Sequence, residues 1–162
     1  MAGTRMQGMG IPEVALPDRD RLGGELQSML VDLVALSLDG KQAHWHVTGE
    51  HFAPVHEQLD RIVDDARAWA DLVAERAVTL GITVDGRPET VAARSATPSF
   101  PTGWLADAEA VRLMSERVER VVVRLRQSLE DLGRLDLATQ DLALEMARGL
   151  EKHLWMLRAQ LA

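Results

Sequence analysis

The chain is organised around three short segments: His44-Trp45-His46-Val47-Thr48-Gly49, His56-Glu57-Gln58-Leu59-Asp60 and Asp71-Leu72-Val73-Ala74-Glu75. Four of the five histidines lie in the first two of these segments and the turn between them. His56 and Asp60 are four residues apart, as are Asp71 and Glu75, so each pair shares one face of a helix. Together with His44, these side chains indicate a metal site built from imidazole and carboxylate ligands.

Composition limits the class of protein. The chain has 162 residues, enough for one domain with a full hydrophobic core, and no cysteine, which excludes disulfides, thiolate chemistry and zinc fingers. No apolar run is long enough to predict a membrane span, and no secretory signal pattern is present, so a cytoplasmic location is expected. The net charge of −7 repels nucleic acid and attracts cations.

Helical periodicity dominates the first half of the chain. Residues 1–17 are rich in glycine and proline and predict a flexible N-terminal tail, and residues 18–162 predict a single helical domain. The first helix is expected to begin at Asp18 and to be closed by Gly49, and the second to run from Phe52 to Gly81. The first helix is apolar on more than one face, which is a first indication of contact between subunits.

The second half of the chain predicts two more helices after a long connection. The segment Ile82–Gly103 is expected to hold a short helix near Pro88–Ala93. The third helix is expected over Leu105–Leu132, with a solvated mixed-charge face and Gly133 as its end, and the fourth from Asp136 to the chain end. No strand pattern is found. The result is an all-α four-helix bundle with a long crossover between its second and third helices; a simple up-down bundle is the alternative that this connection disfavours.

The spacing of the ligand candidates leads to a prediction about assembly. His44 and His56 flank the turn at Gly49, so antiparallel helices bring them face to face. Asp71, however, lies about 22 Å of helix rise from His56, too far for one metal ion. Two copies of the second helix, antiparallel about a two-fold axis, solve this problem. Each of two sites then takes His44, His56 and Asp60 from one chain and Asp71 and Glu75 from its partner.

This pattern resembles the Dps family of mini-ferritins (DNA-binding proteins from starved cells), which have the ferritin-like fold. The resemblance covers about residues 24–161 and rests on Lys41, His44, Trp45, Gly49, Phe52, His56, Glu57, Asp60, Asp71, Glu75, Arg76 and the closing segment Glu151-Lys152-His153-Leu154-Trp155. It implies a hollow dodecamer built from two-fold dimers. It also implies a ferroxidase that oxidises Fe(II), with hydrogen peroxide as oxidant, stores the ferric product and protects against oxidative damage. The five ligand candidates then form its ferroxidase site.

Further residues have two interpretations each. Trp45, next to a ligand, is either a radical quencher or a packing residue. Asp136, Asp141 and Glu145 either line an acidic three-fold pore through which iron is taken up, as the resemblance implies, or are acidic residues at a helix N-terminus. His46 stands where the family usually has Asn, and its position two residues after His44 turns it away from the site.

DNA binding is doubtful on sequence grounds, although a nucleoid-associated, DNA-protecting structural protein with secondary iron chemistry is the alternative function. Phosphate binding needs several clustered cations. Arg5 is the only basic residue among residues 1–17. A DNA partner is therefore expected to bind weakly, and iron, as Fe(II) and Fe(III), is the expected metal.

Overall fold

The computed structural model describes residues 16–97 and 99–162, and it confirms a ferritin-like all-α bundle. Its elements, in chain order, are α1 (Leu16–His46), β1 (Val47–Thr48), α2 (Phe52–Thr79), α3 (Pro88–Arg94), β2 (Leu105–Ala106), α4 (Asp107–Leu135) and α5 (Leu137–Arg158). The residues expected to form a tail lie outside the described part except for the last two, which already belong to α1. None of the described helices is both long enough and apolar enough to cross a membrane.

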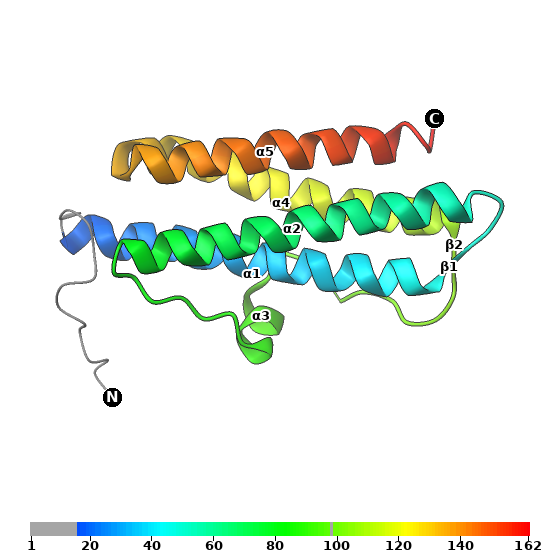
Figure 1. Cartoon of the computed structure of the whole chain (residues 1–162), viewed down its shortest axis with the longest axis horizontal. Coiled ribbons are helices and arrows are strands. Elements are labelled where there is room, and N and C mark those ends of the chain that lie inside the picture. The colour runs from blue at the N-terminus through cyan, green and yellow to red at the C-terminus, as the bar shows by residue number, and fades with distance from the viewer. Residues whose placement is uncertain (1–15, 98) are drawn as a thin grey trace.

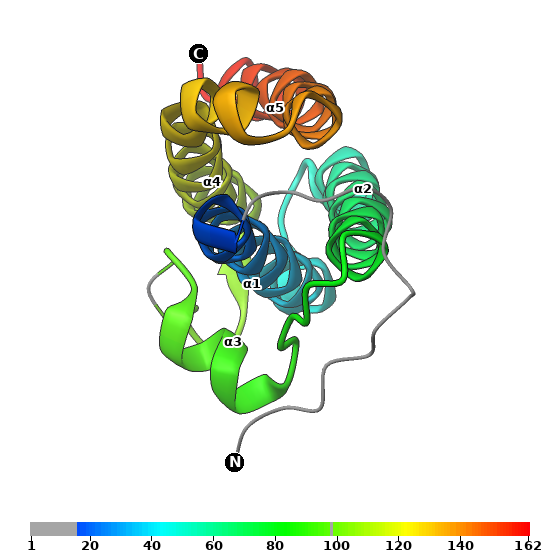
Figure 2. The ribbon, with the colours of Figure 1, turned by 90° about the vertical axis from the view of Figure 1, so that its left-hand side faces the viewer.

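The four long helices form two antiparallel pairs, α1 with α2 and α4 with α5 (Figure 1). The crossover from α2 to α4 runs back along the bundle, so that α2 and α4 are parallel. Its short helix α3 lies against α1, on the side away from α5 (Figure 2). The predicted long crossover and its short helix are therefore confirmed.

The apolar stripes of the four long helices meet in one core. Leu26, Leu59, Met114 and Leu150, one from each long helix, are fully buried in it. Gly40 permits a close approach of α1 to α2, because a Cβ at this position would lie 2.6 Å from Val63 Cγ2. This contact lies one turn before His44, so the packing of the core sets the spacing of the two helices that carry the site.

Several predicted helix boundaries are wrong, including the start of the third helix, which lies at Asp107 because Leu105 and Ala106 form β2. α1 ends at His46, because Val47 and Thr48 pair in parallel with Leu105 and Ala106; this small sheet also corrects the expectation of no strands. Gly133 does not end the third helix, which continues to Leu135; a Cβ there would lie 2.4 Å from Gln140 Nε2, so this glycine makes room for the next helix. α5 ends at Arg158, before the chain end.

The second apolar face of α1 is covered within the same chain. Val31 and Ala35 pack with Val91 of α3 in a small cluster of their own. Most of the face that suggested a subunit contact is therefore covered by the crossover, while Leu38 remains 57% exposed.

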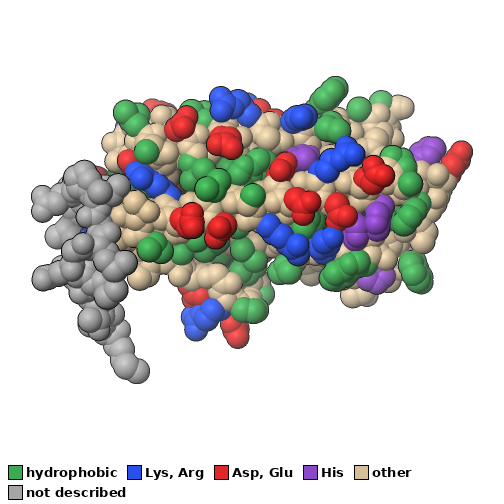
Figure 3. Space-filling view, viewed as in Figure 1, with side chains coloured by type: hydrophobic (Ala, Val, Ile, Leu, Met, Phe, Trp, Pro, Cys, Tyr) green, Lys and Arg blue, Asp and Glu red, His purple; other side chains and the backbone are tan. Residues whose placement is uncertain are grey.

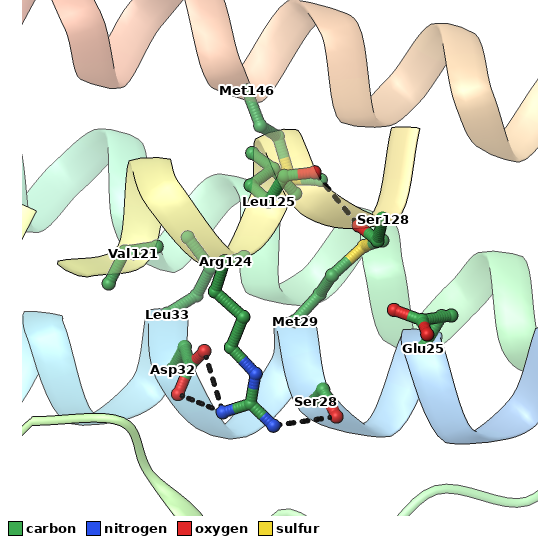
Figure 4. A pocket seen from close by; sticks show the side chains of 10 residues that line it. All are labelled: Glu25, Ser28, Met29, Asp32, Leu33, Val121, Arg124, Leu125, Ser128 and Met146. Carbon is green, nitrogen blue, oxygen red and sulfur yellow. Dashed lines mark hydrogen bonds and ion pairs between the residues drawn. The ribbon is translucent and has the colours of Figure 1, made fainter. Parts of the chain in front are cut away.

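Two ion pairs join α4 to α1, and the carboxylate of one of them also binds the crossover. The Arg124 guanidinium donates to Asp32 at 3.1 Å and to Ser28 at 2.9 Å (Figure 4). Asp32 also accepts from the Ala96 amide at 2.8 Å. Arg117, expected on a solvated face, is instead 2% exposed and donates to Asp39 at 3.0 Å. Burial raises the pKa of both carboxyl groups, and the arginines oppose that shift.

Candidate metal centre

Three of the five predicted ligands come together at the end of the bundle where α1 turns into α2. One ligand atom from each of His44, His56 and Asp60 lies within 4.8 Å of the others. Figure 3 shows histidine, acidic and basic side chains gathered at this end of the face formed by α1 and α2. His44 is buried, and His56 and Asp60 are half-buried. The cluster is therefore open to solvent on one side, as an ion-binding site must be.

The two histidines orient each other across the turn. His44 Nδ1 lies 3.2 Å from the carbonyl oxygen of His56, and His56 Nδ1 lies 3.0 Å from the carbonyl oxygen of His44. Because a carbonyl oxygen only accepts hydrogen bonds, Nδ1 carries the proton and Nε2 keeps the lone pair in the neutral form of each ring. The rings stack with centroids 3.6 Å apart, so the two imidazoles lie side by side in the cluster.

Asp60 is paired with a cation of its own chain. Lys41 Nζ donates to Asp60 Oδ1 at 2.5 Å, and His44 Nδ1 lies 3.2 Å from the same oxygen. The Lys41 hydrogen bond is the main reason why the pKa of Asp60 lies below its usual value, so this carboxyl is ionised at neutral pH. The Lys41 ammonium group therefore competes with any metal ion for the Asp60 carboxylate.

The turn between the two helices is fastened to the start of α4. The Asp107 carboxylate accepts from the His51 amide at 2.7 Å, which together with the Ala108 amide lowers the pKa of Asp107. Gly49 has φ of +139°, and a Cβ there would lie 2.5 Å from the same carboxylate. Glycine is therefore required at this position for two reasons: the backbone conformation and the close approach of Asp107.

The other two predicted ligands do not join this cluster within one chain. Asp71 and Glu75 lie on α2, eleven and fifteen residues beyond Asp60, and both are exposed. Neither has a hydrogen bond or ion pair in the described part of the chain. These unpaired carboxylates at the far half of α2 form a second candidate half-site.

The remaining histidines and Trp45 lie outside the cluster. His46 Nδ1 lies 2.9 Å from the Gln42 carbonyl oxygen, and its ring meets Trp104 edge-on, so it is turned away as expected. His51 is exposed in the turn. His153 is a buried packing residue, 3.0 Å from Gln58 and 2.7 Å from Asp65. Trp45 is 64% exposed, so it does not pack into the core of its own chain.

The three acidic residues predicted to line a pore differ in their surroundings. Asp136 caps α5: its carboxylate accepts from the Thr139 amide at 2.9 Å and from Arg76 at 2.6 Å. Asp141 and Glu145 are exposed on one face of α5 and have no ion pair within the described residues. Asp136 is thus already neutralised by a cation, and only the other two carboxylates are free to attract ions.

Comparison with known proteins assigns the class. The sequence profile of the ferritin-like domain matches residues 24–162. The chain is 35% identical over 149 residues to the DNA protection during starvation protein 2 of Deinococcus radiodurans; the match covers 92% of this chain and 62% of that protein's length. The structure superposes on Dps from Mycobacterium smegmatis with a TM-score of 0.90, at 32% identity, covering 96% of this chain and 94% of that one.

A second solved structure agrees. Dps from Microbacterium arborescens in the high iron form is 31% identical, covers 95% of this chain and 99% of its own, and superposes with a TM-score of 0.87. The fold and the histidine–carboxylate cluster therefore define a ferritin-like protein. Within that class, the chain belongs to the Dps family of mini-ferritins.

Two contacts of the site were missed by sequence reasoning. Lys41 was noted only as part of the resemblance, although it lies three residues before His44 and could have been placed on the same helix face. Asp107 had no such signal, because it reaches the turn from 56 residues further along the chain.

Proposed function

We propose that this protein is a ferroxidase and an iron-storage protein, whose site is assembled from two chains. His44, His56 and Asp60 of one chain hold Fe(II) together with Asp71 and Glu75 of the partner chain. The observation that carries the proposal is the cluster of His44, His56 and Asp60 within 4.8 Å, with both imidazole rings oriented by backbone carbonyls. Imidazole and carboxylate ligands together suit Fe(II).

The proposed reaction is oxidation of Fe(II) by hydrogen peroxide. Two Fe(II) ions give up one electron each, the O–O bond of peroxide breaks, and two protons are taken up as two water molecules form. A two-electron route avoids the release of hydroxyl radical. The protein contributes neutral imidazoles that bind without changing charge and carboxylates that stabilise Fe(III) more strongly than Fe(II). Trp45, exposed next to His44, is in position to quench a stray radical.

The proposed assembly is a hollow dodecamer built from two-fold dimers, with ferric mineral inside. Three observations support it: the chain belongs to the Dps family, its half-sites lie at two separate places on α2, and a relative was solved in a form named high iron. Asp141 and Glu145 are proposed to form an acidic pore for Fe(II) uptake, with Asp136 contributing the start of α5.

The function is tested by mixing Fe(II) with peroxide under anaerobic conditions and following ferric absorbance, with molecular size measured in parallel. We expect peroxide-dependent oxidation by the assembled wild type, its loss in His56→Ala, and its retention in His51→Ala, which changes an exposed histidine outside the cluster. Wild-type protein that gives no peroxide-dependent oxidation, or that stays monomeric, contradicts the proposal. Zn(II) is expected to inhibit, since it binds such ligands more tightly than Fe(II).

The sharing of the site between chains has its own test. One variant lacks the histidines (His44→Ala with His56→Ala), and the other lacks the distant carboxylates (Asp71→Asn with Glu75→Gln). Each alone should be inactive. In a mixed dimer one of the two sites is wild type in both halves, so co-assembly should restore up to half of the wild-type rate. Mixed dimers that remain inactive rule out a shared site.

The alternative is a structural protein that coats and protects DNA. It is favoured by the name of the Deinococcus radiodurans relative, DNA protection during starvation protein 2. The charge of this chain argues against it, because the net charge is −7 and residues 1–17 contain one basic residue. Iron oxidation is therefore the leading function and DNA protection the second.

A further inference from the structure

The exposed face of α2 carries an ordered row of charges between the two half-sites. His56, Asp60, Asp64, Arg67, Asp71 and Glu75 follow one another at steps of three or four residues. At 100° per residue they fall within an arc of about 100°, so they form one stripe along the helix. The opposite side of α2 faces the core with Leu59, Ile62, Ala66 and Val73.

This stripe is symmetric about its own centre. The point midway between His56 and Glu75 lies between Asp65 and Ala66, and the same point is midway between Asp60 and Asp71. An antiparallel copy of α2 that aligns His56 with the partner's Glu75 therefore also aligns Asp60 with the partner's Asp71. Both halves of the proposed metal site are completed by the same single register.

The innermost pair shares this centre and carries opposite charges. Asp64 and Arg67 are equally far from the midpoint, so the same register aligns Asp64 with the partner's Arg67, and Arg67 with the partner's Asp64. Both side chains are exposed, and neither has an ion pair or hydrogen bond among the described residues. Their charged neighbours are already engaged: Arg61 lies 3.4 Å from Glu57, and Asp65 lies 2.7 Å from His153.

We propose that Asp64 and Arg67 form two reciprocal ion pairs across the two-fold axis between two copies of this chain, and that these pairs select the register that completes the metal sites. The inference rests on the proposed function, because the shared site defines the two-fold axis. Two crossing helices are closest near their crossing point, so residues within one turn of the centre make the tightest contacts.

The same two residues disfavour neighbouring registers. A slip of three residues in one direction places Asp64 opposite the partner's Asp64, and the same slip in the other direction places Arg67 opposite the partner's Arg67. Like charges in contact at an interface are repulsive and exclude the wrong alignment. The pair therefore acts as a register device even before metal binds, when Asp60 and the partner's Asp71 have no shared cation between them.

Charge reversal tests the proposal without iron. In Asp64→Arg, two arginines face each other twice across the axis, and in Arg67→Asp two aspartates do; each variant alone should associate about tenfold or more weakly than wild type in metal-free buffer, by sedimentation velocity. Mixing the two variants makes both cross-axis pairs attractive again. In native mass spectrometry, the mixed dimers should then make up well over the half of all dimers that random pairing would give.

Two controls separate this effect from general charge and from intrachain pairing. Arg120→Asp makes the same charge change on α4, away from the stripe, and should associate like wild type and mix statistically with it. The double variant Asp64→Arg with Arg67→Asp restores both cross-axis pairs within one chain type and should associate like wild type. It also covers the case in which a single variant folds poorly.

Three results would overturn the proposal: single variants that associate like wild type, a purely statistical mixture, or a folded double variant that does not associate. These results are distinct from a failure of the proposed function, which is decided by Fe(II) oxidation in the wild type. If the wild type oxidises iron but the charge-reversed variants associate like wild type, the proposed function stands and only the role of Asp64 and Arg67 in setting the register is contradicted.

Discussion

At the scale of single residues, the most consequential contact is the one between Lys41 and Asp60. The Lys41 cation lies 2.5 Å from the carboxylate of Asp60, a proposed ligand, and lowers its pKa, and an incoming metal ion must displace that cation. Lys41 is therefore expected to lower the affinity of the proposed site for a metal ion. The rings of His44 and His56 need no such displacement, because their Nδ1 atoms are satisfied by carbonyl oxygens and their Nε2 atoms remain available.

Lys41→Met is expected to raise the affinity of the site for Co(II) by about fivefold, because a competing like charge is removed from a partly exposed carboxylate. Asp60 stays ionised at neutral pH without its lysine, since the ordinary pKa of an aspartate is 3.8. The measurement is a Co(II) titration followed by visible absorbance. Lys152→Met removes the chain's only other lysine and serves as the control. Unchanged or weaker Co(II) binding in Lys41→Met would show that Lys41 does not compete at this carboxylate.

At the scale of elements, glycines show how closely the helices approach one another. A Cβ at Gly149 of α5 would lie 2.4 Å from Cη2 of the buried Trp69 of α2, whereas a Cβ at Gly24 of α1 would meet nothing within 4 Å. Both glycines lie inside helices, where alanine is intrinsically favoured by about 0.5–1 kcal/mol. The two positions therefore separate helix propensity from helix packing.

Gly149→Ala is expected to destabilise the protein by about 1–3 kcal/mol, because the indole of Trp69 or the helix itself must move. Gly24→Ala should instead stabilise by up to about 1 kcal/mol. Thermal unfolding of both variants at one protein concentration is the measurement. Equal effects of the two substitutions would mean that α2 and α5 are not packed as closely as described.

The start of α5 predicts a pH dependence of stability. Burial opposes ionisation of Asp136, but the hydrogen bonds from Thr139 and Arg76 outweigh it, and its pKa is lowered. A carboxyl group with a lowered pKa in the folded state stabilises that state above its unfolded pKa, and this contribution is lost as the pH falls through the folded value. The contribution of Asp136 should therefore be complete at neutral pH and decline below about pH 4.

Asp136→Asn should lower the unfolding midpoint at pH 7 by about 2–6 °C, because the Arg76 ion pair is lost while the cap is retained in part. The difference between wild type and variant should shrink when the scans are repeated between pH 4 and pH 3. Asp141→Asn makes the same change at an exposed carboxylate of α5 that has no ion pair among the described residues, and gives the reference for general charge effects. A difference that grows on acidification would contradict the assigned sign.

At the scale of the whole molecule, the charge distribution decides which ions and polymers approach. Asp141 and Glu145 are exposed and unpaired among the described residues, in contrast to Asp136. If three copies meet around them, the combined field attracts Fe(II).

Asp141→Asn with Glu145→Gln is therefore expected to slow iron uptake severalfold at low ionic strength while leaving the size of the assembly unchanged. Uptake is followed by ferric absorbance, and size by light scattering. Glu89→Gln, on the crossover helix α3, is the matched control. A double variant that takes up iron at the wild-type rate would contradict the proposed role of Asp141 and Glu145 in a pore.

DNA binding is expected to be weak for the chain as a whole, because its net charge is −7. A gel shift at low salt should show no retarded complex at micromolar protein unless divalent cations bridge the two polyanions. Addition of EDTA distinguishes bridging from direct binding. A complex that survives EDTA would favour the DNA-protecting alternative.

Much of the fold was predictable because the information is local. The stripes of apolar residues that predicted α1, α2, α4 and α5 are the stripes that are buried, and Asp136 caps α5 as expected. The long connection required a crossover, and Pro88 at its start predicted α3. The predicted helix boundaries were wrong where a residue contacts another segment of the chain. Val47 and Thr48 pair with β2 and so do not continue α1, and Gly133 lies inside α4 because it makes room for Gln140.

The fixed rise and period of an α-helix are enough to predict which candidate ligands share a face of α2, and that the candidates at its two ends are too far apart to hold one metal ion. Tertiary packing is needed for the contacts between His44 and His56, between Lys41 and Asp60, and between Asp107 and the turn. These contacts join residues that no periodicity relates. They exist because the packing of α1, α2 and α4 brings those atoms within reach.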